Sequence, residues 1–324
     1  MSHFDLRFAL LFPGQGAQFV GMGKDLAEAF PAARGLFEEA DAVLGYPLSR
    51  FCWEGPAEAL TRTEHCQPAL YVTSLAALAA LEAGVGDPRS AIHPAAAAGL
   101  SLGEYTALSA AGAFSFEDGL RLVRLRGQAM EEAARSTPGT MASILGLELG
   151  PIEAICAQTG AQVANLNAPG QIVISGTTEA VGAASIEAKK QGAKRVIPLE
   201  VGGAFHSRLM EQAAHRLQGA LEAVPIQTQT LRFPVVNNVT GAYYRGAEEV
   251  KSLLVEQLTH SVQWVACMET LLRDSVRTFL EVGPGTVLKG LLRKIRPEAE
   301  AHSVGTVDQA RKAASLVAGA SKSS

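Results

Sequence analysis

The chain has little of what marks a metalloprotein, a disulfide-rich secreted protein or a nucleic-acid-binding protein. Four cysteines occur in 324 residues, and they are scattered without the spacing of metal ligands. We interpret them as free thiols of a cytoplasmic protein and predict no metal site. The formal net charge of −4 argues against nucleic acid as the main partner.

The sequence also indicates no membrane segment. No stretch approaches the length of a membrane span, and residues 1–7 lack the basic start of a secretory signal. Aromatic residues make up only 6% of the chain, whereas 48% of it is apolar and 32 residues are glycine. This composition favours a compact protein without a membrane partner, in which helices and strands pack closely.

The central feature of the sequence is a serine between two glycines, in Gly99-Leu100-Ser101-Leu102-Gly103. A small apolar run precedes it and a helix-forming sequence follows, which is the context of a Gly-x-Ser-x-Gly nucleophile elbow. The glycines let the strand and helix backbones approach, and the helix N-terminus favours negative charge beside the serine. A surface turn with a solvated serine is the alternative explanation of the same pattern.

A glycine-rich turn follows the first predicted strand. Phe8 to Phe12 is a short apolar run, and Pro13-Gly14-Gln15-Gly16 comes directly after it. The turn lacks the lysine and hydroxyl residue of a phosphate-binding loop, and its spacing differs from the dinucleotide-binding pattern. It is either a tight connection to a helix or the source of a second backbone N–H for an oxyanion, with Gln15 as the candidate.

Residues 140–202 have a rhythm of their own. Strand and helix patterns follow there in the order β-α-β-β-α-β, which is that of a ferredoxin-like unit. Strand–helix alternation outside this stretch predicts a mainly parallel sheet covered by helices on both faces. We therefore predict an α/β fold with a large domain from residues 1–137 and 204–324 and an inserted small domain from residues 138–203.

Two further residues stand out as partners for Ser101. His206 opens the segment that returns from the small domain to the large one, where a base could meet the serine across a cleft. Arg126 lies in a predicted helix, offset from Arg121 and Arg124, which can share a solvated face. Periodicity alone leaves the burial of Arg126 open.

Taken together, these segments resemble the malonyl-CoA:acyl-carrier-protein transacylase family. The matching segments, in the family's order, are Phe12-Pro13-Gly14-Gln15-Gly16, Gln67-Pro68-Ala69, Gly99 to Glu104, Leu125-Arg126-Gly127, Ala204-Phe205-His206 and Val282-Gly283-Pro284. They span nearly the whole chain. The resemblance implies an α/β-hydrolase-like large domain that carries an inserted ferredoxin-like small domain.

The resemblance also implies the chemistry. Ser101 would accept malonyl from malonyl-CoA and pass it to the phosphopantetheine thiol of an acyl carrier protein, in a ping-pong reaction through an acyl-serine ester. His206 would be the general base, oriented by the backbone carbonyl of Gln257. The backbone N–H groups of Gln15 and Leu102 would form the oxyanion hole.

The same resemblance implies which residues select the acyl group. Arg126 would bind the free carboxylate of malonyl, because a guanidinium matches a carboxylate bidentately. Phe205 would crowd an α-methyl group, and Gln67 and Asn167 would line the pocket. Leu100 is a departure, since most family members have histidine immediately before the nucleophile. A leucine there has no hydrogen bond to donate, and we expect it to pack into the strand end.

The implied partners are malonyl-CoA and a phosphopantetheinylated acyl carrier protein, with the coenzyme A thioester as a substrate and no metal or redox cofactor. The family suggests a monomer. Carrier proteins are acidic, so a basic docking surface is expected. Two clusters are candidates, and each is equally well explained as a solvated face: Lys189, Lys190, Lys194 and Arg195, and Arg293, Lys294 and Arg296.

Two other functions fit the sequence. Leu100 and the serine–histidine pair fit an acyl-carrier-protein acyl hydrolase of the same fold, although we expect such a hydrolase to lack Arg126. A catalytically silent docking module for carrier proteins is a third hypothesis, against which the nucleophile elbow argues. The sequence leaves open whether the carrier serves fatty acid or polyketide synthesis.

Overall fold

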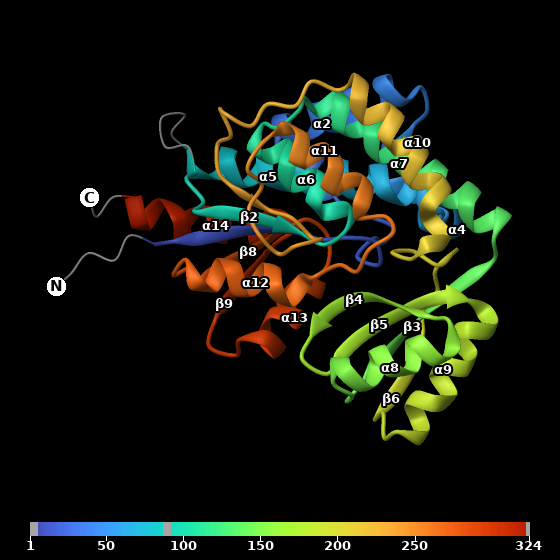
Figure 1. Cartoon of the computed structure of the whole chain (residues 1–324). Helices are drawn as coiled ribbons and strands as arrows, with labels where there is room; N and C mark the ends of the chain where they lie inside the picture. The colour runs from blue at the N-terminus through green and yellow to red at the C-terminus, as the bar shows by residue number, and fades with distance from the viewer. Residues whose placement is uncertain (1–5, 87–91, 322–324) are drawn as a thin grey trace.

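A five-stranded sheet forms the centre of the larger part of the molecule (Figure 1). The computed structural model describes residues 6–86 and 92–321, so the prediction about residues 1–7 falls mostly outside them. The sheet has the strand order β7-β2-β1-β8-β9, and every pairing between these strands is parallel, as predicted. The strands are β1 (Phe8–Phe12), β2 (Ala96–Gly99), β7 (Val235–Val236), β8 (Thr278–Val282) and β9 (Glu300–Val304).

The central strand β1 shows how this sheet divides the core. Its residues alternate between two faces, as strand geometry requires. The even-numbered residues pack with α5 (Thr63–Val85), α6 (Leu102–Ala111) and α7 (Phe116–Ser136). The odd-numbered residues pack with α12 (Trp264–Arg273) and α13 (Val287–Ile295). Both faces are therefore covered by helices, which Figure 1 shows above and below the sheet.

A second, smaller unit has its own sheet and its own core. Its four strands are antiparallel, in the order β4-β5-β3-β6, and α8 and α9 cover one face. This is the ferredoxin-like βαββαβ arrangement that the sequence pattern predicts; the domain boundaries at residues 138 and 203 stay a prediction. The elements are β3 (Gly139–Leu145), α8 (Leu149–Thr159), β4 (Gln162–Ala168), β5 (Gln171–Thr177), α9 (Thr178–Lys190) and β6 (Arg195–Pro198).

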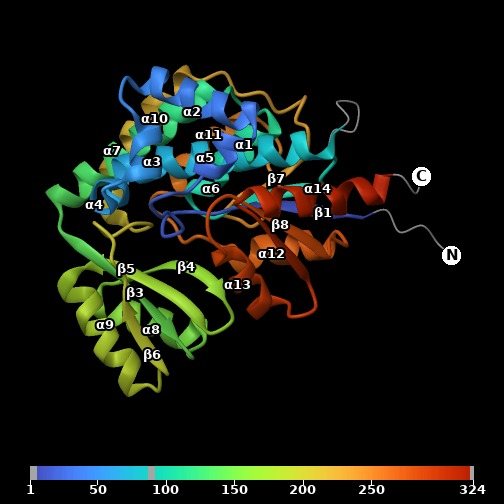
Figure 2. The same cartoon turned by 180° about the vertical axis from the view of Figure 1, so that it is seen from behind.

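The small unit is joined to the large one by main-chain hydrogen bonds. The N–H of Leu166 in β4 donates to the carbonyl oxygen of Val262 at 2.9 Å, and the N–H of Val262 donates to that of Ala164 at 2.8 Å. Nearby, Lys294 of α13 donates to Gln171 Oε1 at 2.6 Å. Figures 1 and 2 show α13 beside β4, between the two sheets.

Three segments differ from what periodicity alone predicts. Residues 25–39 have the apolar periodicity of one helix but form two, α1 (Lys24–Ala29) and α2 (Pro31–Leu44), because Pro31 has no N–H to continue a helix and starts a new one instead. Strand β9 and helix α14 (Val307–Ser321) lie where patterning indicates no element. The remaining helices are α3 (Leu48–Glu54), α4 (Ala57–Thr61), α10 (Glu211–Ala223) and α11 (Ala247–Glu256).

Helix α5 corrects the statement that no stretch approaches a membrane span. It has 23 residues, an 18-residue window of mean hydropathy 1.5, and Pro68 within it. By length and composition it passes as a span, so the expectation was wrong. However, 72% of that window is buried inside the protein, where α5 packs against α2, α7 and α14. A core helix of this kind is apolar all round because protein surrounds it.

Candidate active site

Ser101 lies on the sharp turn between β2 and α6. Its backbone has φ +52° and ψ −102°, a region that costs a non-glycine residue about 1–3 kcal/mol. The crossing of strand and helix is very close: a Cβ on Gly99 would lie 1.9 Å from the carbonyl carbon of Gly103, and one on Gly103 would lie 2.0 Å from the Phe12 oxygen. Only glycine fits at either position, which explains the residue pattern around the serine.

Asn238 braces this turn from the neighbouring segment after β7. Its Oδ1 accepts a hydrogen bond from the Ser101 N–H at 2.7 Å, and its Nδ2 donates to the Gly99 oxygen at 2.8 Å. The two bonds satisfy backbone groups on both sides of the strained residue. The sequence does not indicate this role, because Asn238 is far from Ser101 along the chain and carries no motif of its own.

His206 meets Ser101 across the cleft, as its position in the sequence suggested. Its side chain is 4% exposed, and Nε2 lies 2.8 Å from Ser101 Oγ. Nδ1 lies 2.7 Å from the backbone oxygen of Gln257. A carbonyl only accepts, so Nδ1 carries the proton and Nε2 is free to accept one from the serine hydroxyl. Burial, and then the charge of Arg126, lower the pKa of His206 to about 4, which keeps the ring neutral.

Arg126 is 1% exposed, which settles the question that periodicity left open. Its NH2 group donates to Ser101 Oγ at 3.0 Å and to Gln257 Oε1 at 2.9 Å, and its NH1 group donates to Gln67 Oε1 at 2.8 Å. The guanidinium also lies over the ring of Tyr105, 5.2 Å from its centroid. Burial lowers the pKa of Arg126, and the nearby tyrosine and Glu104 oppose that shift.

These groups surround a cavity of about 510 Å³ between the two units. Gln15, Leu100, Leu102, Asn167 and Phe205 all line it, together with Ser101, Arg126 and His206. Gln67 does not: it is buried behind Arg126, so the expectation that it lines the pocket is wrong. Its amide oxygen points at the guanidinium instead.

The backbone N–H groups of Gln15 and Leu102 donate to no acceptor in the described part of the chain. Leu102 is the first residue of α6, so its N–H has no acceptor within the helix. Both residues border the cavity beside Ser101. Two such donors at a helix N-terminus favour a developing negative charge.

Glu104 is a second residue of the site for which the sequence predicts no role. It is 0% exposed and accepts hydrogen bonds from Gln257 Nε2 at 2.5 Å, from the Asn238 N–H at 3.2 Å and from the Tyr244 hydroxyl. Burial raises its pKa to about 7. A glutamate within a helix of otherwise small and apolar residues was the signal available in the sequence.

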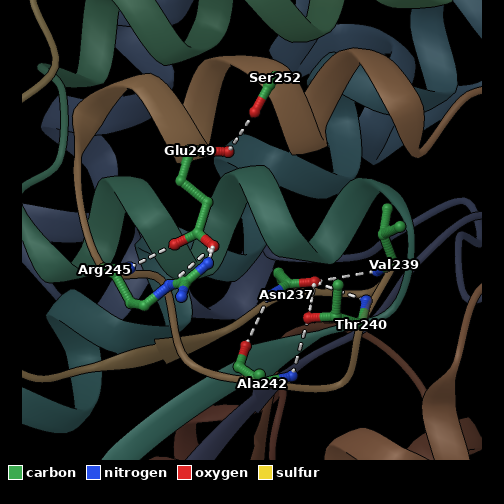
Figure 3. A network of polar contacts seen from close by, with 7 residues as sticks. All are labelled: Asn237, Val239, Thr240, Ala242, Arg245, Glu249 and Ser252. Carbon is green, nitrogen blue, oxygen red and sulfur yellow. Dashed lines mark hydrogen bonds and ion pairs between the residues drawn. The ribbon is translucent and has the colours of Figure 1, made fainter.

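The segment that carries Asn238 and leads to Gln257 is held by a network of polar contacts (Figure 3). Asn237 Oδ1 accepts from the N–H groups of Val239 and Thr240 and from the Thr240 hydroxyl, while Nδ2 donates to the Ala242 oxygen at 2.7 Å. Farther along, Arg245 pairs with Glu249 at 2.7 Å in the first turn of α11. The turn and the helix start are thereby fixed.

A serine–histidine pair on a nucleophile elbow, with two N–H groups beside it that have no acceptor among the described residues, defines an acyl-transferring serine enzyme. The family model "Acyl transferase domain" matches residues 9–318, and the chain belongs to that family of acyltransferases.

Several known proteins are similar over nearly their full length. The malonyl CoA-acyl carrier protein transacylase of Bacillus subtilis is 46% identical, across 89% of this chain and 90% of that protein. The transacylase of the same name from Escherichia coli K12 is 42% identical, across 89% and 93%. A solved complex of a malonyl-transacylase with a type II PKS acyl-carrier protein has a TM-score of 0.91 and 39% identity, covering 96% of this chain and 99% of that one.

Proposed function

We propose that this acyltransferase moves a malonyl group from malonyl-CoA to the phosphopantetheine thiol of an acyl carrier protein. The observation that carries the proposal is the position of the Arg126 guanidinium, which is buried and whose NH2 group lies 3.0 Å from Ser101 Oγ. A fixed cation beside the nucleophile suits an acyl group with a free carboxylate. The names of the relatives support the same substrate and the same carrier.

In the first half-reaction Ser101 Oγ attacks the thioester carbonyl and His206 Nε2 takes its proton. The N–H groups of Gln15 and Leu102 stabilise the oxyanion, each contributing about 2.7–4 kcal/mol to the transition state. The protonated ring, held by the Gln257 carbonyl, then gives its proton to the departing coenzyme A sulfur. The product is malonyl esterified to Ser101.

In the second half-reaction the carrier's pantetheine thiol replaces coenzyme A. His206 takes the thiol proton, the sulfur attacks the ester carbonyl, and the proton passes to the departing Ser101 oxygen. Coenzyme A enters only as part of the substrate. Each proton transfer and each hydrogen bond is assigned to this chain, so the scheme uses no metal or redox cofactor.

Selection of the acyl group follows from the walls of the cavity. Arg126 binds the malonyl carboxylate, and the buried ring of Phe205 leaves little room for an α-methyl group. Leu100 adds an apolar surface without a hydrogen-bond donor. Asn167 and Ser143 each bring a buried oxygen, without a partner in the described part of the chain, that suits the amide groups of a pantetheine arm.

We also propose that the chain acts as a cytoplasmic monomer with the two domains predicted from the sequence. All the groups named in the scheme come from one chain, and its four cysteines are free and buried. The separate core within residues 142–196 supports an inserted domain of residues 138–203. Among the basic clusters, the one on α13 is favoured for carrier docking, because Val287 and Leu291 of the same helix line the cavity.

The test is intact-mass measurement after mixing the protein with malonyl-CoA, methylmalonyl-CoA or acetyl-CoA. We expect a malonyl adduct on Ser101, little methylmalonyl adduct, and transfer to a carrier protein when one is added. Ser101→Ala is the control and should take up nothing. Active protein that forms no malonyl adduct would contradict the proposal. Release of free acid in place of transfer would instead indicate the hydrolase that Leu100 suggested.

A further inference from the structure

Gln257 contacts the active site through its side chain as well as through its backbone carbonyl, which accepts from His206. Its Nε2 donates to the Ser101 backbone oxygen at 3.0 Å and to Glu104 Oε2 at 2.5 Å. Its Oε1 accepts from Arg126 at 2.9 Å. One residue therefore touches the nucleophile, the base and the guanidinium, and the direction of its amide decides whether the last of these contacts exists.

The Glu104 carboxylate and the Ser101 carbonyl together set that direction. Both oxygens accept hydrogen bonds from the amide nitrogen of Gln257, which leaves the amide oxygen facing Arg126. The opposite amide orientation would place an NH2 group against the guanidinium, donor against donor. Glu104 is itself fixed by Asn238 and Tyr244, so the constraint originates outside the cavity.

The Gln257 amide also lies between two opposite charges, the Glu104 carboxylate and the Arg126 guanidinium. Within the described residues, no carboxylate forms a salt bridge with Arg126. A carboxylate in direct contact would occupy the guanidinium fork, whereas an unbalanced buried cation would be costly. Glu104, one residue removed, offsets the charge without contacting the guanidinium, and Arg126 Nε has no hydrogen-bond partner in the described part of the chain.

We propose that Glu104 is a positioning residue for acyl selection: through the Gln257 amide it holds the Arg126 guanidinium beside Ser101 and free to bind an incoming carboxylate. This inference rests on the proposed malonyl transfer. It assigns Glu104 no contact with substrate and no proton transfer. Its signature is a change in preference between acyl groups with and without a carboxylate.

The experiment compares acylation of Ser101 by malonyl-CoA and by acetyl-CoA, using single-turnover intact mass on the full chain. In Glu104→Gln we expect the malonyl-to-acetyl rate ratio to fall about tenfold or more, since a charge-assisted contact is lost from one substrate only. Glu281→Gln is the matched control. Glu281 is also 0% exposed and accepts two backbone N–H groups, from Leu288 and Lys289, at the start of α13. Its ratio should stay within threefold of the wild-type value, whatever happens to stability.

A second variant covers the case in which Glu104→Gln folds poorly. Glu104→Gln/Gln257→Glu exchanges the two side chains and preserves a hydrogen bond between them, but places the carboxylate directly on Arg126. We expect its malonyl-to-acetyl ratio to stay low. A wild-type ratio in either variant would overturn the inference. Wild-type protein that forms no malonyl adduct would instead defeat the proposed function, so the two failures are distinguishable.

Discussion

Replacing Arg126 with alanine is the most direct test of how the site selects its acyl group. The guanidinium is buried, and NH2 lies 3.0 Å from the oxygen that would carry the acyl chain. A bidentate carboxylate contact has two charge-assisted hydrogen bonds, each worth about 1.5–3 kcal/mol. Their loss amounts to about 3–6 kcal/mol, or about 10² to 10⁴ in rate.

Part of the damage in Arg126→Ala is unrelated to the substrate carboxylate. The amide oxygens of Gln67 and Gln257 lose their donor, and the surroundings of Ser101 change for every substrate. The ratio of malonyl to acetyl acylation cancels those common losses. We therefore expect this ratio to fall about 10² to 10⁴-fold, and less in Arg126→Lys, which keeps the charge but loses the fork.

The assay is rapid quenching of a single turnover with malonyl-CoA or acetyl-CoA, followed by intact mass. Arg124→Ala provides a matched control on the same helix. The NH1 group of Arg124 donates to the Leu44 oxygen at 3.0 Å, and its side chain does not line the cavity. Its ratio should equal that of the wild type. If the ratio in Arg126→Ala stayed within threefold of the wild-type ratio, the carboxylate contact would be refuted.

Three other predictions follow from burial and close packing. Because the pKa of His206 is lowered to about 4, the ring stays neutral as the pH falls, and the rate of acetyl transfer to Ser101 should be constant from pH 8 to pH 5. A histidine with an ordinary pKa would lose activity below about pH 6.5. Such a loss, measured by intact mass in quenched reactions, would contradict a buried neutral base. Gly103→Ala should destabilise the fold by about 3 kcal/mol in urea unfolding, since its Cβ would meet the Phe12 oxygen, whereas Gly219→Ala in α10 has open space and should be neutral or stabilising. Burial raises the pKa of the Cys52 thiol to about 12 and that of the Cys156 thiol to about 11, and all four cysteines are buried. Iodoacetamide at pH 8 should therefore label no cysteine of the native protein. Rapid labelling of the native protein would show instead that the thiols are accessible.

The parts of the fold that the sequence predicted well are those with short-range signals. The run Phe8–Phe12 is fully apolar and is followed by a turn, and it forms β1 with those bounds. The alternating pattern after residue 139 gives the small antiparallel sheet for the same reason. Strand β9 was missed because its residues are mostly polar and half-buried at a sheet edge.

In the active site, too, the residues with short-range sequence signals were predicted and those without them were not. The Gly-x-Ser-x-Gly pattern is contiguous, so the position of Ser101 follows from local sequence. The places of Gln15 and His206 along the chain made them candidates, and the family resemblance supplied the remaining roles. The roles of Asn238 and Glu104 were not predicted, because they depend on contacts between residues about 135 positions apart in the chain. Gln67 was predicted to line the cavity but contacts Arg126 instead. A motif indicates that a residue belongs to the site, but it does not show which neighbour the side chain contacts.

The main-chain link at Val262 has a mechanical consequence. It joins strand β4 of the small unit to the same stretch of chain that, a few positions earlier, presents the carbonyl on which the imidazole ring rests. Any rotation that widens the crevice must either rupture that link or drag this stretch along with it. Admitting a bulky thioester and aligning the proton acceptor are therefore not independent events in this molecule.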